Sequence, residues 1–488
     1  MRVLKVVAVV IVGLLVVAFA GCEGHVPYRS AGLKVDASCA DVYRKHDANA
    51  NLASDSIKED WKHPCWNRSV EEHERFDLLT VEFDDQGWVQ DAYKVPPPEG
   101  DYLSTFFTKL EGIYQQERKK GRGLSIVVFT HGWKHNAQPA DGDVRSFRAV
   151  LRDLATVEDF LTTKGTRPMR VVGIYVGWRG SSLDWPVLKE LTFWDRKNTA
   201  HNVAHGMVRE MFKRLDYFRD RSRGDGGDRD RDIRMLTVGH SFGGLITFES
   251  MSSEFVRNTV RFREVRPGKP IDNYMSRVGD LVVLVNPAFE GARYESLRAS
   301  AQRQIEYEKN QLPVSIVVTS RGDWATRYAF PIARYFSTIF EAKKGAEDDA
   351  LIKTVGHNER YITHELAACR PDEQEKCRKA CPSPQTQQQA RVGTLTTAAI
   401  EAEFEFMKRV EKEGFRPNEY LCGAMSLNAT KQWHPANNPY WVVRTTEDII
   451  DDHGDLFNPN LVTFVRQMYM GFIYARLLGP RSGKTPTK

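Results

Sequence analysis

Short runs of apolar residues recur along the middle of the chain, and polar or glycine-containing turns separate them. Ser125–Thr130, Val171–Val176 and Leu281–Val285 are continuous apolar runs rich in β-branched residues, which is typical of strands buried on both faces. Between such runs, Phe147–Phe160 and Asn198–Tyr217 carry apolar residues at helical spacing. Strands that alternate with helices predict an α/β fold built on a mostly parallel, doubly wound sheet.

Further segments extend this pattern toward both ends of the chain. Phe76–Phe83 and Trp88–Tyr93 flank a short turn and predict an N-terminal β-hairpin. The remaining expected elements are a helix over Tyr102–Lys120, strands over Val314–Thr319 and Tyr440–Thr445, a helix over Ala398–Glu413 and a terminal helix over Phe457–Leu478. The periodicity weakens between residues 341 and 437, which predicts an insertion there.

One strand ends in a pattern that carries chemistry. The apolar run that begins at Ile233 stops at Gly239-His-Ser241-Phe-Gly243, and Gly244–Glu254 follows as an amphipathic helix. A serine flanked by glycines between a strand and a helix is typical of a nucleophile elbow, where the serine hydroxyl is exposed in a strained turn. The alternative is an ordinary strand-to-helix turn of an α/β sheet.

Length and charge narrow the functional classes. The chain has 488 residues, 41% of them hydrophobic and 11% aromatic, which is enough for a large core. Its 69 basic and 64 acidic residues leave a net charge of only +5, without one obvious basic stripe. This balance argues against a dedicated nucleic-acid-binding protein.

The first 22 residues have the character of a targeting segment. Arg2 and Lys5 precede the apolar run Val6–Ala20, and Phe19-Ala-Gly-Cys22 closes the segment. Small residues before a cysteine resemble a bacterial lipoprotein cleavage site, which implies a lipid attached to Cys22. The alternative is an uncleaved N-terminal signal anchor. Both interpretations place the body of the chain in the cell envelope, on the extracytoplasmic side.

Cysteine usage agrees with an oxidising compartment. Without Cys22 the chain keeps six cysteines, and an even number in such a compartment predicts disulfides. We expect a Cys39–Cys65 bridge near the N-terminus. Two further bridges are expected among Cys369, Cys377, Cys381 and Cys422, with their pairing left open. Metal binding by Cys369, Cys377 and Cys381 is the weaker interpretation, because no C-x-x-C pair or paired histidines support it.

The expected organisation follows from these observations. Residues 1–22 are a lipoprotein signal peptide, 23–70 a tether with an N-terminal extension, and 71–340 the first part of the core. Residues 341–437 are an insertion or lid carrying disulfides, 438–478 the last strand and helix of the core, and 479–488 a basic tail.

In this order the motifs resemble the α/β-hydrolase superfamily, in particular its serine esterase and lipase-like members. Families of this fold place a catalytic triad in the chain order nucleophile, acid, histidine. The resemblance therefore implies Ser241 as nucleophile, Asp323 as acid and His453 as base. Glu290 is the main rival for the acid. His357, His364 and His434 are the rivals for the base.

The resemblance also implies an oxyanion hole. One donor would be the backbone amide of Phe242, directly after the nucleophile, and the other the amide of Trp133 in the His131-Gly-Trp133 loop. His131 and His135 are four residues apart, but no carboxylate was expected to complete a metal site with them. We therefore expect no metal and no organic cofactor. Trp133, Trp178, Trp185 and Trp194 are candidates for lining an apolar acyl pocket.

Two functions from different classes follow. The first is a membrane-tethered serine hydrolase that cleaves carboxylic esters of small molecules or lipids through an acyl-serine intermediate. The second is a non-catalytic lipoprotein that uses a hydrolase fold as a binding or assembly module.

Overall fold

The computed structural model describes most of the chain after residue 60 and two short segments before it. The described residues are 27–29, 37–49, 61–90, 102–179, 193–221, 232–265, 280–303, 307, 311–337, 346–381, 395–431 and 437–475.

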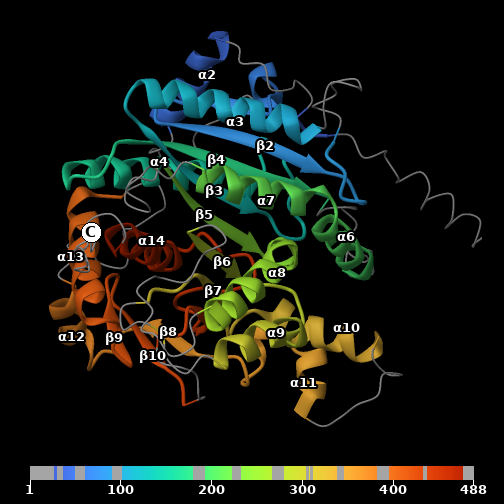
Figure 1. Cartoon of the computed structure of the whole chain (residues 1–488), viewed down its shortest axis with the longest axis vertical. Coiled ribbons are helices and arrows are strands. Elements are labelled where there is room, and N and C mark those ends of the chain that lie inside the picture. The colour runs from blue at the N-terminus through green and yellow to red at the C-terminus, as the bar shows by residue number, and fades with distance from the viewer. Residues whose placement is uncertain are drawn as a thin grey trace, which may run out of the picture.

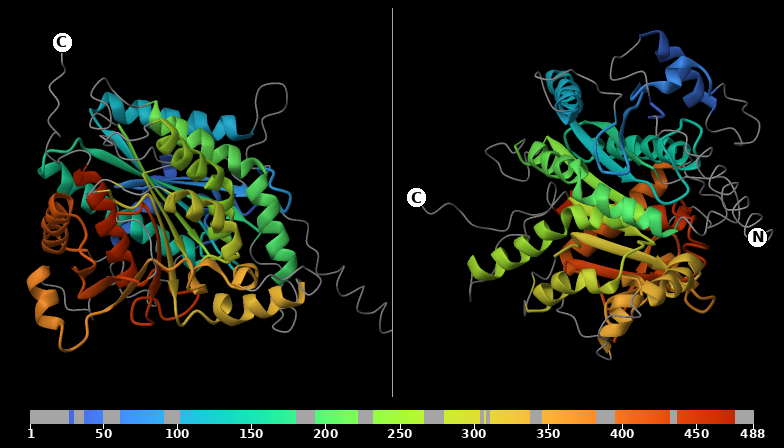
Figure 2. Two further views of the ribbon diagram at one scale, coloured as in Figure 1. Left: turned by 60° about the horizontal axis from the view of Figure 1, so that its bottom comes forward. Right: turned by 90° about the vertical axis from the view of Figure 1, so that its right-hand side faces the viewer.

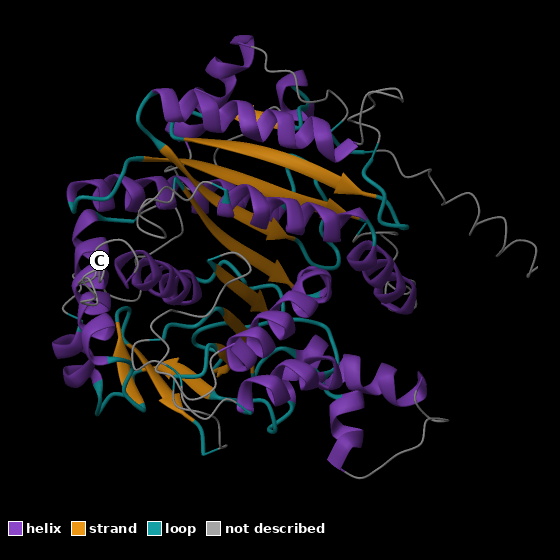
Figure 3. Cartoon of the chain, viewed as in Figure 1, coloured by secondary structure: helices purple, strands orange, loops and turns teal. Residues whose placement is uncertain are grey.

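A single sheet of 11 strands runs through the molecule in the order β1-β2-β4-β3-β5-β6-β7-β11-β8-β10-β9 (Figures 1 and 3). All neighbours from β2 to β8 in this order are parallel, while β1, β10 and β9 pair antiparallel at the two edges. The strands are β1 (Val70–Glu72), β2 (Phe76–Phe83), β3 (Gly123–Thr130), β4 (Met169–Trp178), β5 (Ile233–His240), β6 (Leu281–Val285), β7 (Ser315–Ser320), β8 (His364–Ala368), β9 (Asn418–Leu421), β10 (Met425–Ala429) and β11 (Tyr440–Thr445).

Helices cover both faces of the sheet, as Figure 2 shows. Those of eight residues or more are α2 (Ala40–Asn49), α3 (Tyr102–Lys119), α4 (Gly142–Thr163), α6 (Phe193–His205), α7 (Met207–Asp220), α8 (Phe242–Val265), α9 (Gly291–Gln302), α10 (Phe330–Ser337), α13 (Thr397–Glu413) and α14 (Pro459–Ile473). The short ones are α11 (Ala346–Ile352), α12 (Gln374–Ala380), the π-helical turn η5 (Ala325–Ala329) and the 3-10 turns η1 (Ala37–Cys39), η2 (Pro64–Asn67) and η6 (Val355–His357).

Alternate residues of each central strand enter two different cores. Ile126 and Val128 of β3 pack with α3, α6, α7 and α8, whereas Val127 and Phe129 pack with α4 and α14. Because neither face of these strands meets water, both sets of alternating positions are apolar, and the strands appear in the sequence as unbroken hydrophobic runs. The α/β class with a mostly parallel sheet, expected from those runs, is confirmed.

Two local expectations differ from the structure. The expected hairpin is short, because β2 is followed only by an isolated bridge between Phe83 and Val89, and residues 91–93 lie outside the described part. The helix expected over Asn198–Tyr217 is two helices, α6 and α7, which meet at Gly206. A side chain at Gly206 would lie 2.6 Å from the carbonyl oxygen of Gly87, so the turn after β2 occupies that space.

Residues 341–437 contribute to the same sheet. The strands β8, β10 and β9 extend it beyond β11, and α13 packs against α14. Three disulfides are present: Cys39–Cys65, Cys369–Cys377 and Cys381–Cys422. The first is the bridge expected near the N-terminus, and the other two resolve the pairing that the sequence left open.

Candidate active site

Ser241 lies in the turn between β5 and α8 and is 2% exposed. Its φ of 55° is in the left-handed region, which is uncommon for a residue with a side chain and is maintained only where the surroundings enforce it. Here its N–H donates to the carbonyl of Val285 at 3.0 Å, and its own carbonyl accepts from the N–H of Ala288 at 3.1 Å. The turn is therefore fixed to the end of β6.

The two glycines that flank Ser241 are required for close packing. A Cβ on Gly243 would lie 2.2 Å from the carbonyl oxygen of Thr130, and one on Gly239 would lie 2.8 Å from the carbonyl oxygen of Gly243. Both distances are too short for any side chain. The first turn of α8 therefore sits directly against the end of β3.

His453 lies in the loop after β11 and contacts two of the residues singled out in the sequence. Its Nε2 is 2.7 Å from Oγ of Ser241, and its Nδ1 is 2.9 Å from Oδ2 of Asp323. The side chain of His453 is 25% exposed, whereas that of Asp323 is fully buried. The structure thus brings Ser241, His453 and Asp323 into one hydrogen-bonded chain, although His453 and Asp323 are 130 residues apart.

Asp323 follows β7, and besides His453 it is hydrogen-bonded by Thr326. The N–H of Thr326 donates to Oδ1 at 3.0 Å, and its hydroxyl donates to Oδ2. Burial raises the pKa of the Asp323 carboxyl, but the neighbouring His453 and the hydrogen bonds from Thr326 outweigh it, so the pKa is lowered from its ordinary value. Asp323 is therefore an ionised carboxylate that accepts the Nδ1 hydrogen of His453.

Two residues to which the sequence assigned no role hold the His453 loop in place. Nε2 of His240 lies 2.8 Å from the carbonyl oxygen of His453, and Nδ2 of Asn286 donates to the same oxygen at 3.3 Å. Burial, with a smaller contribution from His453, lowers the pKa of His240 to about 3, so its ring is neutral and Nε2 carries the donated hydrogen. The only sequence signal was position, since His240 directly precedes Ser241 and Asn286 directly follows β6.

The His131-Gly-Trp133 loop approaches Ser241 from the end of β3. A Cβ on Gly132 would lie 2.6 Å from Nδ1 of His240 and 2.9 Å from Cβ of Ser241. The rings of Trp133 and Phe242 are 6.5 Å apart, and Phe242 is the first residue of α8. The side chains of the two residues expected to supply oxyanion-hole amides therefore lie near each other.

His131 is a structural residue of this loop. Its Nε2 accepts from the N–H of Trp178 at 3.1 Å, and its Nδ1 lies 2.8 Å from the carbonyl oxygen of Gly132. Burial lowers the pKa of His131 to about 4, which keeps the ring neutral. Trp178 is itself buried against His131 and Phe242, while Trp185 and the side chain of Trp194 lie outside the described part.

The rival acid and the rival bases have other partners. Glu290 forms ion pairs with Lys197, Arg293 and Arg334. Burial raises the pKa of this carboxyl, but the three cations outweigh that effect and lower the pKa to about 2. Nε2 of His357 lies 3.0 Å from the hydroxyl of Thr326, which in turn donates to Asp323. The ring of His364 packs 4.3 Å from that of Trp441 at the start of β8, and His434 lies outside the described residues.

An apolar cavity of about 90 Å³ lies between the sheet, α4 and α14. Its lining includes Phe129, Val238, Val285 and Phe457. Val285 is the residue whose carbonyl accepts the N–H of Ser241, so one end of the cavity lies near the site.

Among the described residues, two groups have the spacing of a metal site. In the first, His135 lies 3.0 Å from Asp141 and 3.5 Å from Asp143, so the expectation that no carboxylate accompanies His135 is wrong. Burial opposes protonation of His135, but the two carboxylates outweigh it and raise its pKa. Each ring nitrogen faces a carboxyl group, and burial raises the pKa of Asp143 to about 7. This group is best described as an ion-pair cluster.

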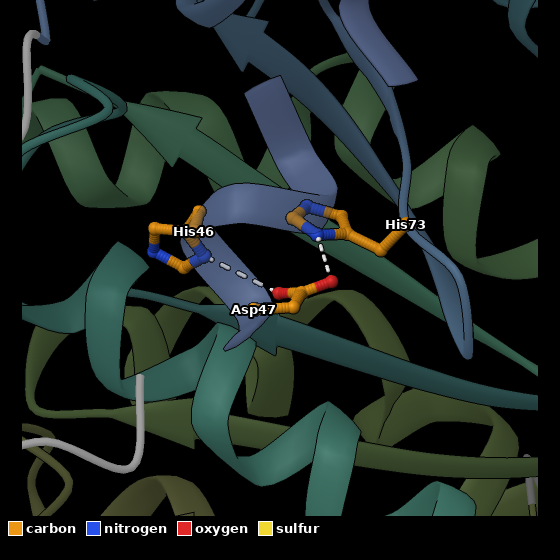
Figure 4. Close-up of side chains that lie close together, drawn as sticks. All are labelled: His46, Asp47 and His73. Carbon is orange, nitrogen blue, oxygen red and sulfur yellow. Dashed lines mark hydrogen bonds and ion pairs between the residues drawn. The ribbon is translucent and has the colours of Figure 1, made fainter. Parts of the chain in front are cut away.

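The second group is His46, Asp47 and His73 (Figure 4). Asp47 lies between the two rings, at 3.3 Å from Nδ1 of His46 and 2.9 Å from Nδ1 of His73. Nε2 of His73 contacts Glu71 at 3.0 Å. These carboxylates outweigh burial and raise the pKa of His73, and each of its nitrogens faces a carboxylate oxygen to which it can donate.

No helix of the described part is long and apolar enough to cross a membrane. Cys22 and the expected signal segment 1–22 lie outside that part.

Comparisons with known proteins add little. No family model matches the chain, and the curated proteins contain no match. Among solved structures, the phospholipase PlaB from Legionella pneumophila, in complex with thio-NAD, is similar to part of it, with 13% identity over 50% of this chain and 45% of that chain. The chain therefore covers less than half of that phospholipase. The TM-score of this similarity is only 0.20.

Proposed function

We propose that this protein is a serine hydrolase of the α/β-hydrolase superfamily that cleaves carboxylic esters, with Ser241, His453 and Asp323 as its catalytic triad. The observation that carries the proposal is the chain of hydrogen bonds of 2.7 Å and 2.9 Å through both nitrogens of His453. An ionised, buried Asp323 holds the hydrogen of His453 on Nδ1. Nε2 is then left with a lone pair directed at the hydroxyl of Ser241, as a general base requires.

The reaction follows from this geometry. Oγ of Ser241 attacks the ester carbonyl carbon while Nε2 of His453 takes its hydrogen. Collapse of the tetrahedral intermediate breaks the bond to the alcohol oxygen, which receives that hydrogen from His453, and leaves an acyl group on Ser241. Water then repeats the sequence, with His453 again as base, and releases the carboxylic acid and free Ser241.

The negative charge that develops on the carbonyl oxygen needs backbone donors. The amide of Phe242 is at the N-terminal end of α8, where the helix dipole favours an anion. We assign the second donor to the amide of Trp133, because Gly132 brings this loop within packing distance of Ser241. No metal or organic cofactor enters these steps.

An active-site probe tests the nucleophile. A fluorophosphonate reacts with a serine only where a base activates it, so the wild-type chain should be labelled and the Ser241→Ala variant should not. Ser252→Ala is the matched control, because Ser252 lies on the following helix and donates to a backbone carbonyl. Absence of labelling in the folded wild-type protein would favour the non-catalytic binding module instead. Equal labelling of Ser241→Ala would show that Ser241 is not the nucleophile.

We also propose that the chain is a lipoprotein anchored through Cys22 on the extracytoplasmic side of the envelope. This rests on Arg2, Lys5 and the apolar run before Cys22. Cells fed a radiolabelled fatty acid should incorporate label into the wild-type protein and not into Cys22→Ala. Label that persists in Cys22→Ala would contradict lipid attachment at Cys22, and a wild-type protein that takes up no label would leave the uncleaved signal anchor as the explanation.

A further inference from the structure

Four large side chains form an exposed apolar surface on the helical segment that follows Asp323. Trp324 is 61% exposed, Tyr328 47%, Ile332 58% and Tyr335 49%. They are spaced by four, four and three residues along η5 and α10, so they lie on one side of the segment. We call these four residues the aromatic face. Large apolar side chains are costly to leave in water, and their alignment on one side indicates a binding surface.

The opposite side of the same segment is held firmly by the core. Thr326 is 1% exposed, Phe330 is fully buried, and the ammonium of Lys197 lies 4.8 Å from the ring of Phe330. Arg334 pairs with Glu290 at 2.9 Å. The segment is therefore anchored along its length, and the aromatic face is a defined surface of the folded protein.

The aromatic face begins beside the candidate active site. Trp324 follows Asp323, whose carboxylate holds His453. At Gly322 the chain packs against the His453 loop, since a Cβ there would lie 2.4 Å from the carbonyl oxygen of Asp451. In Figure 1, α10 and α11 lie at the edge of the molecule, on the side toward which the arrowheads of β2 and β4 point.

Positive side chains lie next to the aromatic face. The guanidinium of Arg327 is 5.1 Å from the ring of Tyr328. Both residues line a cleft of about 510 Å³, whose full lining is Arg321, Arg327, Tyr328, Pro331, Ile352, Lys353, His357, Glu359 and Arg444.

The charges around this cleft leave a positive excess. Arg321 and Arg444 share Glu365, and Arg444 also reaches Glu359. Lys353 pairs with Asp349. Arg327 is the one of these four cations that forms no ion pair with a carboxylate in the part of the chain that the structure describes.

We propose that the aromatic face docks on the surface of a bilayer that contains anionic phospholipids. Trp and Tyr favour the boundary between headgroups and acyl chains, because their rings are apolar and their tips form hydrogen bonds. Ile332 would enter the acyl region, and Arg327 would meet the lipid phosphates. A lipid on Cys22 would hold the protein near the membrane, whereas the aromatic face would turn the Asp323 side of the site toward it.

Tryptophan quenching by lipids tests the docking without reference to catalysis. The full chain is mixed with vesicles of phosphatidylcholine and phosphatidylglycerol that carry bromine near the headgroup end of the acyl chains. The difference in fluorescence between the wild-type chain and the Trp324→Phe variant is the emission of Trp324 alone. We expect bromine to quench this emission by at least half. Trp88→Phe is the matched control, because Trp88 is 62% exposed but lies in the turn after β2. Emission from Trp324 that bromine does not quench would overturn the proposal.

A kinetic comparison tests the consequence and rests on the proposed hydrolase activity. Because moving an apolar side chain from water into the acyl region is favourable, Tyr328→Ser with Ile332→Ser should slow hydrolysis of a vesicle-borne ester by about tenfold or more. Hydrolysis of a soluble short-chain ester should not change. If the variant hydrolyses both substrates at the wild-type rates, the docking proposal is contradicted. If the wild-type chain hydrolyses neither substrate but vesicles still quench Trp324, docking is supported and the hydrolase function is wrong.

Lipid charge and self-association complete the test. Arg327→Gln should reduce the preference for vesicles with phosphatidylglycerol over vesicles of phosphatidylcholine alone, and an unchanged preference would overturn the role of anionic lipid. If the wild-type chain dimerises without vesicles and the Tyr328→Ser, Ile332→Ser variant does not, the face is an interface between two copies and the membrane proposal is wrong.

Discussion

Thr326 connects two side chains through a single hydroxyl. It donates to Asp323, so its oxygen must accept from Nε2 of His357, 3.0 Å away. Burial lowers the pKa of His357 to about 4, and the neutral ring keeps one hydrogen for this contact. A fixed row therefore runs from Ser241 through His453, Asp323 and Thr326 to His357, and Thr326 acts as a positioning residue for the carboxylate.

The hydroxyl of Thr326 can be tested by two conservative changes. Thr326→Val removes one hydrogen bond to a charged group, which is worth about 2 kcal/mol, and should lower kcat for ester hydrolysis by about tenfold or more with little change in KM. Thr326→Ser keeps the hydroxyl and should restore most of the rate. If valine and serine at this position behave alike, the hydroxyl does not act through Asp323.

At the scale of elements, a buried charge cluster joins the N-terminal helix to the sheet. Glu71 of β1 accepts from Arg29 and Arg148, both fully buried, and from His73. His73 continues to Asp47 on α2. Such a cluster is stable only while complete, because the loss of one partner leaves an uncompensated buried charge.

His73 gives this cluster a pH dependence. Its folded pKa is raised above the unfolded value of about 6.5, so its contribution is complete below that pH and is lost as pH rises through the folded pKa. The free energy of unfolding in urea should therefore differ more between wild type and His73→Gln at pH 6 than at pH 9. Exposed His205→Gln is the control. A difference that grows toward pH 9 would contradict the charged state assigned to His73.

Sequence patterns predicted those features that a segment's own residues determine. The parallel strands were visible because both of their faces are buried, and the turn at Ser241 because the glycines beside it leave no room for side chains. The break at Gly206 was not visible, since it is caused by Gly87 in a distant turn. His240 and Asn286 were missed for the same reason, because they hold a backbone carbonyl more than 160 residues away. The catalytic roles of Ser241, Asp323 and His453 remain predictions.

At the scale of the molecule, disulfides fasten the edge of the sheet that β8, β10 and β9 form. The Cys381–Cys422 bridge spans 41 residues and Cys369–Cys377 spans only 8. The backbone N–H of Cys422 donates to Gln467 of α14 at 3.0 Å, so this edge is also joined to the helix that follows the His453 loop.

The two bridges should differ in their effect on stability. In the chain-entropy model, closing the longer loop stabilises the fold by about 4 kcal/mol and closing the shorter one by about 2–3 kcal/mol. Replacing Cys381 and Cys422 by serine should therefore lower Tm more than replacing Cys369 and Cys377 by serine, as measured by calorimetry. Equal or reversed losses would show that strain or local packing dominates over loop length.

The pairing of β7 with β11 has a consequence for how this chain could diversify. Ser320 lies opposite Thr445 in the parallel register, so Asp323 and His453 emerge from adjoining strand ends whatever the chain does in between. The cost of closing a loop grows only slowly with its length. The part of this stretch that follows His357 can therefore gain, lose or exchange whole modules over evolutionary time while the distance between acid and base stays constant.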